Sequence, residues 1–461
     1  MKNKILTAAL YSAGLLLAGS ACAGTDDPVT DTSNTSDFRL SGFGTLDVVH
    51  SNNRQADFSS TVLQPNGPGR SSAISFGVDT KAGIQATGRI GKDLTATVQV
   101  VADHRADNSY SPRFEWANLK YQITQDTYVR AGRVVAPVFM VSDYRNVGYA
   151  QTTVRMPLEV YFVNPITHID GIEFGTRFEL GGGRLGLQLS GGRQKESTAK
   201  PVPGGMDIIQ PQGSAKLGNL TYEYGPSTFR LGLAKSRVDA QSAALDQVDQ
   251  LFQPQAALGG TSVGALLGHP ENTIAGRHSI RVKLLNLGYA YDAGDWLAQT
   301  EYVSSSGGGN MYLDLDAWYA LAGYRLGKFT PYASFSEVKS RISADVTRQP
   351  RAAVPASLSA VLPADMLAQL NQAAWGINST DASLALGQQQ RTLTLGVRYD
   401  FYKNLALKFQ YDRIRKPGSL SSPNKGFFIV PSELVGSNQA PAFTTSASTI
   451  NLLTLALDFV F

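Results

Sequence analysis

The sequence contains a single cysteine, Cys22, and only five histidines among its 461 residues. Cys22 lies within an N-terminal export segment, so the exported chain is expected to contain no cysteine, which excludes disulfides, thiolate metal sites and cysteine nucleophiles. No two histidines have the spacing of metal ligands on one face, and no phosphate-binding or dinucleotide-binding fingerprint is present. The sequence therefore predicts no enzyme activity, no metal site and no cofactor.

Charged residues are also scarce, at 17% of the chain, whereas a soluble protein contains roughly 25%. The 41 basic and 37 acidic residues give a formal charge of +4, and no long basic run indicates a nucleic-acid partner. After residue 23, no apolar run approaches the roughly 20 residues of a membrane-spanning helix. The lack of such a run excludes a helical membrane protein. A hydrophobic content of 43% argues against a disordered chain.

Residues 1–23 have the pattern of a signal peptide. Lys2 and Lys4 precede an apolar stretch at 5–17, and Ala21-Cys22-Ala23 forms a cleavage site of small residues. A buried N-terminal helix is the alternative interpretation. We expect cleavage after Ala23, which leaves a short N-terminal segment at 24–37.

Alternation of apolar and polar residues with a period of two dominates the sequence from Phe38 onward, and it predicts β-strands. In the segment 392–401, for example, Leu393, Leu395 and Val397 alternate with polar or small residues. Sixteen such candidate strands lie at about 38–50, 72–91, 93–104, 113–124, 127–133, 168–180, 184–194, 214–224, 227–238, 278–292, 296–306, 312–326, 329–341, 390–402, 405–416 and 448–461.

The connections between these strands alternate in length. Seven are tight turns rich in Gly, Asp and Asn, and the eight between them are mostly long loops. The longest loops span 134–167, 239–277 and 342–389, and the last two contain Ala/Leu/Gln-rich segments that could form short helices. This plan predicts an all-β fold, namely a transmembrane antiparallel up-and-down β-barrel of about sixteen strands.

The positions of the aromatic residues favour a membrane barrel over a soluble one. Many lie beside the short turns on the register expected to face outward, as in the aromatic girdle at a water–lipid boundary. The final strand carries Phe459 and ends the chain on Phe461. Together with the export signal, this terminal strand resembles the assembly signal of outer-membrane barrels.

Three local matches add to this architecture: the segment 40–47, which reads LSGFGTLD, the pair Gly132-Arg133 before the long third loop, and the terminal Phe461. With them, the chain resembles the general porins of Gram-negative outer membranes over about 38–461. The resemblance implies an outer-membrane location in contact with lipid, a homotrimer, and recognition of the last strand by the barrel-assembly machinery. The third loop departs from the family because it lacks an acidic, glycine-rich tip, and the loops 239–277 and 342–389 are unusually long.

The resemblance also implies that the third loop folds into the bore and opposes its charges to basic residues on the wall. The candidate constriction comprises, on the loop, Asp143, Arg145, Arg155 and Glu159, and on the wall, Arg133, Lys81, Arg177 and Arg398. Arg133 is assigned by its position in the motif, whereas Lys81, Arg177 and Arg398 are assigned by their inward register. Alternatively, Arg145 and Arg155 are surface charges on an exposed loop.

The function expected from these features is passive diffusion of small hydrophilic solutes and ions through a water-filled pore. Two alternatives stay open at this point. One is a substrate-selective channel whose loops form a binding site, and the other is a barrel without transport, serving as an adhesin or a structural protein.

Overall fold

The computed structural model describes residues 37–162, 166–202, 205–239, 243–272, 279–307, 314–341, 350–385, 387–418, 424–430 and 442–461. The expected signal peptide lies outside these residues, as does all but Asp37 of the segment 24–37. Within the described residues, no helix is long and apolar enough to cross a membrane.

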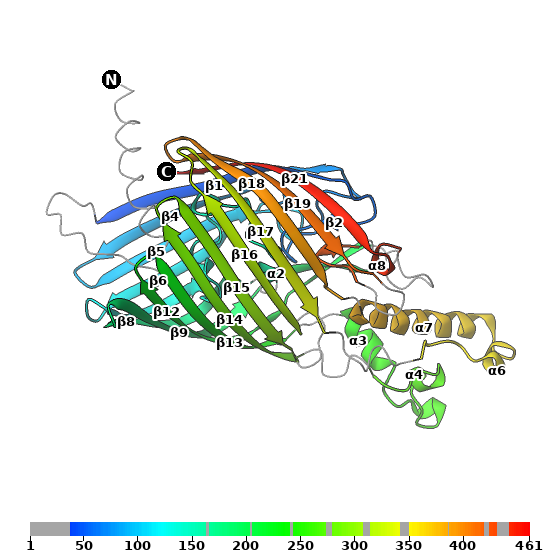
Figure 1. Ribbon diagram of the computed structural model, residues 1–461. Coiled ribbons are helices and arrows are strands. Elements are labelled where there is room, and N and C mark those ends of the chain that lie inside the picture. Colours follow the sequence, from blue (N-terminus) through cyan, green and yellow to red (C-terminus); the bar gives the residue numbers. More distant parts are fainter. Residues whose placement is uncertain are drawn as a thin grey trace, which may run out of the picture.

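Sixteen long antiparallel strands form a closed up-and-down barrel, as the alternation and turn chemistry predict (Figure 1). The strands are β1 (Phe38–Ser51), β4 (Lys81–Ile90), β5 (Leu94–Asp103), β6 (Arg113–Gln122), β7 (Thr127–Val135), β8 (His168–Leu180), β9 (Gly183–Lys195), β12 (Gln212–Tyr224), β13 (Ser227–Asp239), β14 (Ser279–Ala293), β15 (Trp296–Ser306), β16 (Leu315–Tyr324), β17 (Phe329–Ser340), β18 (Gln390–Tyr402), β19 (Leu405–Lys416) and β21 (Ser448–Val460).

The predicted second strand, 72–91, is too long. Only β4 continues the ladder, and the short β3 (Ile74–Ser75) pairs separately with β1. Residues 76–80 leave the sheet because their side chains have other partners: the hydroxyl of Thr80 donates to Asp47, and Asp79 pairs with an arginine inside the barrel. The predicted loop 195–213 also contains a hairpin, β10 (Thr198–Val202) and β11 (Gly205–Ile209).

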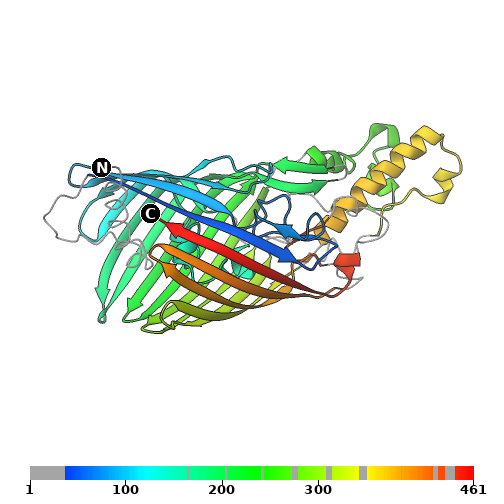
Figure 2. The same ribbon diagram turned by 90° about the horizontal axis from the view of Figure 1, so that it is seen from above.

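The long loops gather at one end of the barrel and carry several helices (Figures 1 and 2). Among the described residues these helices are α3 (Ala243–Gln250), η3 (Ala256–Leu258), α4 (Val263–Leu266), α6 (Ala356–Ser359), α7 (Ala364–Ala385) and α8 (Ala442–Thr445). Helices α3 and α4 contact α7, and Val248, Leu267 and Ile377 form their shared apolar core. The Ala/Leu/Gln-rich segments therefore form a helical cap, in which α7 is longer than the short helices expected there.

The barrel closes where β1 meets β21. At this seam, glycines of β1 stand opposite phenylalanines at the C-terminal end of the chain. The backbones of Gly42 and Phe461 exchange two hydrogen bonds of 2.9 Å. The Phe461 ring lies over Gly42 and the Phe459 ring over Gly44, so a Cβ at Gly44 would stand only 2.4 Å from the nearest ring atom. The rings cover glycines that offer no side chain of their own, a device that stabilises strand pairs. The segment 40–47 is thus half of the closing seam.

We predict that deleting Phe461 lowers the yield of folded, heat-modifiable barrel in the membrane without lowering synthesis or export. The deletion removes two backbone hydrogen bonds and uncovers Gly42 at the point where the edges must join. Gel mobility before and after heating measures the folded fraction. Tyr402→Ala, which removes an exposed ring away from the seam, is the control, and equal folded yields for the two variants would contradict the prediction.

The outward face of the barrel carries an apolar band with aromatic residues at the turn end, as expected. Phe329 stacks on Tyr399, and Trp296 contacts Tyr324 edge-on, each pair joining neighbouring strands. Along β18, Leu393 and Leu395 are 42% and 47% exposed, whereas Thr394 between them is 8% exposed. The alternation of apolar-out and polar-in residues therefore follows the pleat of the strand.

We predict that Leu395→Arg lowers the free energy of unfolding by about 2–4 kcal/mol, because the cation would face hydrocarbon near the bilayer centre. Thr97→Arg on β5 is the control, since Thr97 pairs with Thr87 on the inward face and is only half-buried. Thr394 is unsuitable as a control because it donates a hydrogen bond to Asp412 in a packed interior. Reversible urea unfolding in lipid vesicles measures both variants, and equal losses would show that the register is wrong.

Candidate functional site

The third loop, between β7 and β8, lies inside the barrel. Its elements are η1 (Ser142–Tyr144), η2 (Gly148–Ala150) and α2 (Leu158–Tyr161). Segment η2 contacts β1 and β21, and α2 contacts β15, β16 and β17, so the loop touches the wall on both sides of the seam. Figure 1 shows α2 between the strands of the barrel. These contacts place η2 and α2 against the strands β1, β21 and β15–β17.

Apolar residues hold one part of the loop against the wall. Phe139, Val160 and Tyr161 are almost completely buried, and they share a core with Tyr319 and Val303 of the facing strands. The rings of Phe139 and Tyr161 lie 4.9 Å apart. Burial of this kind contributes about 1.5–3 kcal/mol for each large apolar side chain. An exposed loop would leave these residues in water, which explains why the loop packs inside.

Arg155 anchors the loop through charges. Its guanidinium lies 2.7 Å from an Asp79 oxygen and 2.8 Å from an Asp412 oxygen, and it donates to the Thr454 hydroxyl at 2.9 Å. The residue is only 8% exposed. Burial alone would lower the pKa of this guanidinium, but the two carboxylates outweigh it and raise the pKa above its usual range. The interpretation of Arg155 as a surface charge is therefore wrong.

Glu159 is a second buried anchor, 1% exposed. Its carboxylate accepts hydrogen bonds from the hydroxyls of Ser336 and Thr392, at 2.6 and 2.5 Å, and from the Gln390 amide at 2.7 Å. All three donors belong to inward positions of β17 and β18. A carboxylate with several neutral donors remains satisfied without a cation, so Glu159 is a structural contact of the loop.

Two wall cations bind the loop backbone. Arg398 donates to the carbonyl oxygens of Tyr149 and Gln151 at 2.6 and 2.9 Å, and Lys408 donates to those of Gly148 and Thr153 at 2.8 and 3.0 Å. Arg398 is therefore on the inward face, as its register predicts, but it is used to hold the loop. Lys408, which is completely buried, was not among the predicted residues although its register also points inward.

Glu301 on β15 is a further anchor that sequence reasoning missed. It accepts hydrogen bonds from the hydroxyls of Tyr161 and Tyr319, from the Asn286 amide at 2.9 Å, and from the backbone N–H of Met140 at 3.0 Å. Glu301 is buried at 1% exposure, and it joins both ends of the loop to the wall. The period-two pattern places it inward, but only the fold shows that the loop reaches it.

Asp143 and Arg145 lie near the middle of the loop. Arg145 donates to the Tyr161 carbonyl at 2.8 Å and lies 5.7 Å from the centre of the Tyr161 ring, so it fixes the conformation of the loop. Burial lowers the pKa of Arg145, although an arginine keeps its proton in proteins. Asp143 lies in η1, within electrostatic range of Tyr128 on β7 and Glu173 on β8.

Further cations occupy the wall formed by β4, β6, β7 and β8. Lys81, Lys120, Arg130 and Arg177 occupy inward register positions on β4, β6, β7 and β8. Arg130 lies 3.2 Å from the Glu173 carboxylate, and Arg177 stands opposite Gly186 on β9. These inward cations lie on strands other than β15–β17, which α2 contacts.

Arg133 is not part of this wall. It pairs across the strands with Asp170, and the same face of β7 and β8 carries Ile172, which is 60% exposed on the outside of the barrel. The Arg133 guanidinium lies 2.7 Å from the Asp170 carboxylate. The motif position predicted an inward side chain, but the pleat reverses its direction, so Arg133 points outward.

The described residues contain no group of three or more His, Cys, Asp or Glu side chains that could hold a metal ion. Charged side chains inside the barrel hold the third loop against the wall, and the inward side of β4–β9 carries further cations together with the buried acids Glu115 and Glu173.

We predict that Arg155→Met destabilises the barrel by about 3–5 kcal/mol, because it leaves Asp79 and Asp412 buried without their cation. Arg145→Met, which removes a loop arginine that has a carbonyl and a ring as partners, is expected to cost less. Adding Asp79→Asn and Asp412→Asn to Arg155→Met should recover part of the lost free energy of unfolding, because the two buried carboxylates are then neutral amides. Urea unfolding with limited proteolysis of the loop measures these effects, and no loss for Arg155→Met would exclude the anchoring role.

No profile of a known protein family matches the chain, and no curated protein matches it. Several solved outer-membrane proteins are similar in structure. OmpF of Salmonella typhi, solved in complex with daunomycin, is 14% identical with a TM-score of 0.47, over 92% of this chain and 97% of that one. An anion-selective porin from Comamonas acidovorans has the same identity and TM-score, over 92% and 99%. Pseudomonas putida OprB is 11% identical with a TM-score of 0.47, over 92% and 94%.

Proposed function

We propose that the protein is an outer-membrane channel through which small hydrophilic solutes and ions diffuse passively. The observation that supports this proposal is the asymmetry of the interior. The third loop is fastened to β1, β12–β19 and β21, whereas the inward face of β4–β9 carries polar and charged side chains. A sixteen-stranded barrel is too wide for its own side chains to fill, so a loop on one side narrows the bore without closing it.

The charges at the narrow part set an expected ion preference. The interior side of β4–β9 carries the cations Lys81, Arg89, Arg113, Lys120, Arg130, Arg177 and Arg184 and the acids Asp103, Glu115, Glu173 and Glu179, while Asp143 lies on the loop. Cations outnumber anions in this set, and charged rings at a constriction determine which ions pass. We therefore propose a preference for anions, with Arg177 as one of its determinants.

We predict that Arg177→Ala shifts the channel toward cations, as measured by reversal potentials under a salt gradient in planar bilayers. The shift should be largest near 0.01 M salt, where the Debye length is about 30 Å, and small at 1 M, where it is about 3 Å. Arg133→Ala removes the same charge from the neighbouring strand but on the outside, so it is the matched control. If both variants shift the potential equally, or neither does, the proposed constriction is wrong.

A substrate-selective channel is the second candidate, and the helical cap at the loop end favours it. The α3–α4–α7 core holds the cap together independently of the barrel wall. Conductance that saturates with one solute would distinguish such a channel from passive diffusion, and a lack of any conductance would indicate a barrel without transport. Homotrimeric assembly and use of the barrel-assembly machinery remain predictions from the family resemblance.

A further inference from the structure

The outward face of β17, β18 and β19 changes abruptly from apolar to basic as these strands approach the loop end. On β19, Phe409 and Tyr411 are followed on the same face by Arg413 and Arg415. On β18, Leu395 and Leu393 are followed by Arg391. Lys339 occupies the corresponding part of β17. The apolar band of the barrel thus borders directly on a cluster of cations.

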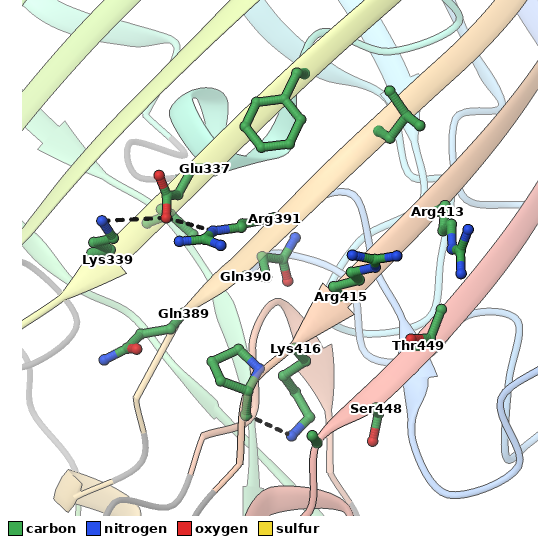
Figure 3. A pocket seen from close by; sticks show the side chains of 15 residues that line it. Glu337, Lys339, Gln389, Gln390, Arg391, Arg413, Arg415, Lys416, Ser448 and Thr449 are labelled. Carbon is green, nitrogen blue, oxygen red and sulfur yellow. Dashed lines mark hydrogen bonds and ion pairs between the residues drawn. The ribbon is translucent and has the colours of Figure 1, made fainter.

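These cations line a groove of about 730 Å³ on the outside of the barrel (Figure 3). Arg391 and Arg415 stand directly opposite each other on neighbouring strands, and Leu393 and Phe335 form the apolar side of the groove. Glu337 pairs with Arg391 at 2.7 Å and with Lys339 at 3.3 Å, which leaves a net positive charge. Within the described part of the chain, neither Arg413 nor Arg415 has an acidic partner.

The same arrangement recurs on β12, β13 and β14. There Lys216, Lys235 and Lys283 stand directly opposite one another on the outward face. They line a second groove, of about 550 Å³, together with apolar residues of the band, among them Leu189, Leu233 and Leu285. Like charges directly opposite each other destabilise a sheet unless something neutralises them. Two such groups at the same edge of the apolar band therefore indicate an external anion.

We propose that this outer face binds lipid whose headgroup carries anionic phosphate, and that the groove of Arg391, Arg413 and Arg415 is its principal site. Arginine matches the geometry of phosphate oxygens with paired N–H donors. The acyl chains of the same lipid would lie along Leu393, Leu395 and Phe409, which a free phosphate ion could not use. A second copy docking through the same groove would bring arginines against arginines, which disfavours a self-complementary contact.

Lipid binding at this groove requires only that the barrel lies in a membrane, and it does not depend on whether the bore conducts. If the channel proposal fails, the lipid proposal still stands. If the lipid proposal fails, the channel proposal still stands.

The test compares Arg413→Ala/Arg415→Ala with Lys328→Ala/Lys403→Ala. The control removes two exposed cations from the turns at the other end of the same three strands. The full barrel in a neutral detergent is titrated with a bis-phosphorylated glycolipid, with the same glycolipid after phosphatase treatment, and with inorganic phosphate. Native mass spectrometry counts the bound lipid, and thermal unfolding reports the stabilisation that binding causes.

We expect the bis-phosphorylated lipid to bind and to stabilise the wild type and the control variant equally. The groove variant should bind it about tenfold more weakly, because charge-assisted hydrogen bonds are lost. Equal binding of the dephosphorylated lipid, or an unchanged affinity in the groove variant, would overturn the proposal. Inorganic phosphate that competes at the affinity of the lipid would overturn the assignment to lipid. Dissociation of an oligomer in the groove variant, with lipid affinity unchanged, would assign the surface to a subunit contact instead.

Discussion

The structure depends on one requirement, which is that no backbone hydrogen-bonding group may be left unpaired on the sheet. An open sheet of sixteen strands would expose two edges, and in hydrocarbon each unsatisfied group would cost several kcal/mol. Pairing of β1 with β21 removes both edges. Closure fixes the diameter of the ring, and the diameter creates an interior that strand side chains alone cannot fill. The third loop occupies part of that interior.

Inside the barrel, buried charged side chains fix the position of the third loop, as an apolar core fixes the packed elements of a soluble protein. Arg155, Glu159, Lys408 and Glu301 each take up several partners, and each connects the loop with a different part of the wall. Removing one partner from such a network leaves an uncompensated charge, so the loop has one favourable position. The loop is thus held in one position against the wall.

Much of the fold could be predicted from the sequence, because strand alternation and turn residues are local signals. The inward positions of Arg398 and Arg177 follow from the pleat alone. Arg133 shows the limit of motif reasoning, since a shift of one residue in register exchanges the two faces of a strand. Glu301 and Lys408 were missed because their partners are contributed by a loop more than a hundred residues away, and no local pattern reports such a contact.

Arg155 links the docking of the third loop to the closure of the barrel. Its partners Asp79, Asp412 and Thr454 lie far apart in sequence, on both sides of the seam where the barrel closes. Thr45 on β1 donates to Asp458 on β21 across the same seam, and Lys408 on the neighbouring β19 pairs with that carboxylate. The loop therefore cannot dock fully until the first and last strands have met, and closure without the loop leaves these charges unsatisfied. We therefore expect docking and closure to be linked in one cooperative step, and the entropy of bringing such distant segments together to make that step a late one.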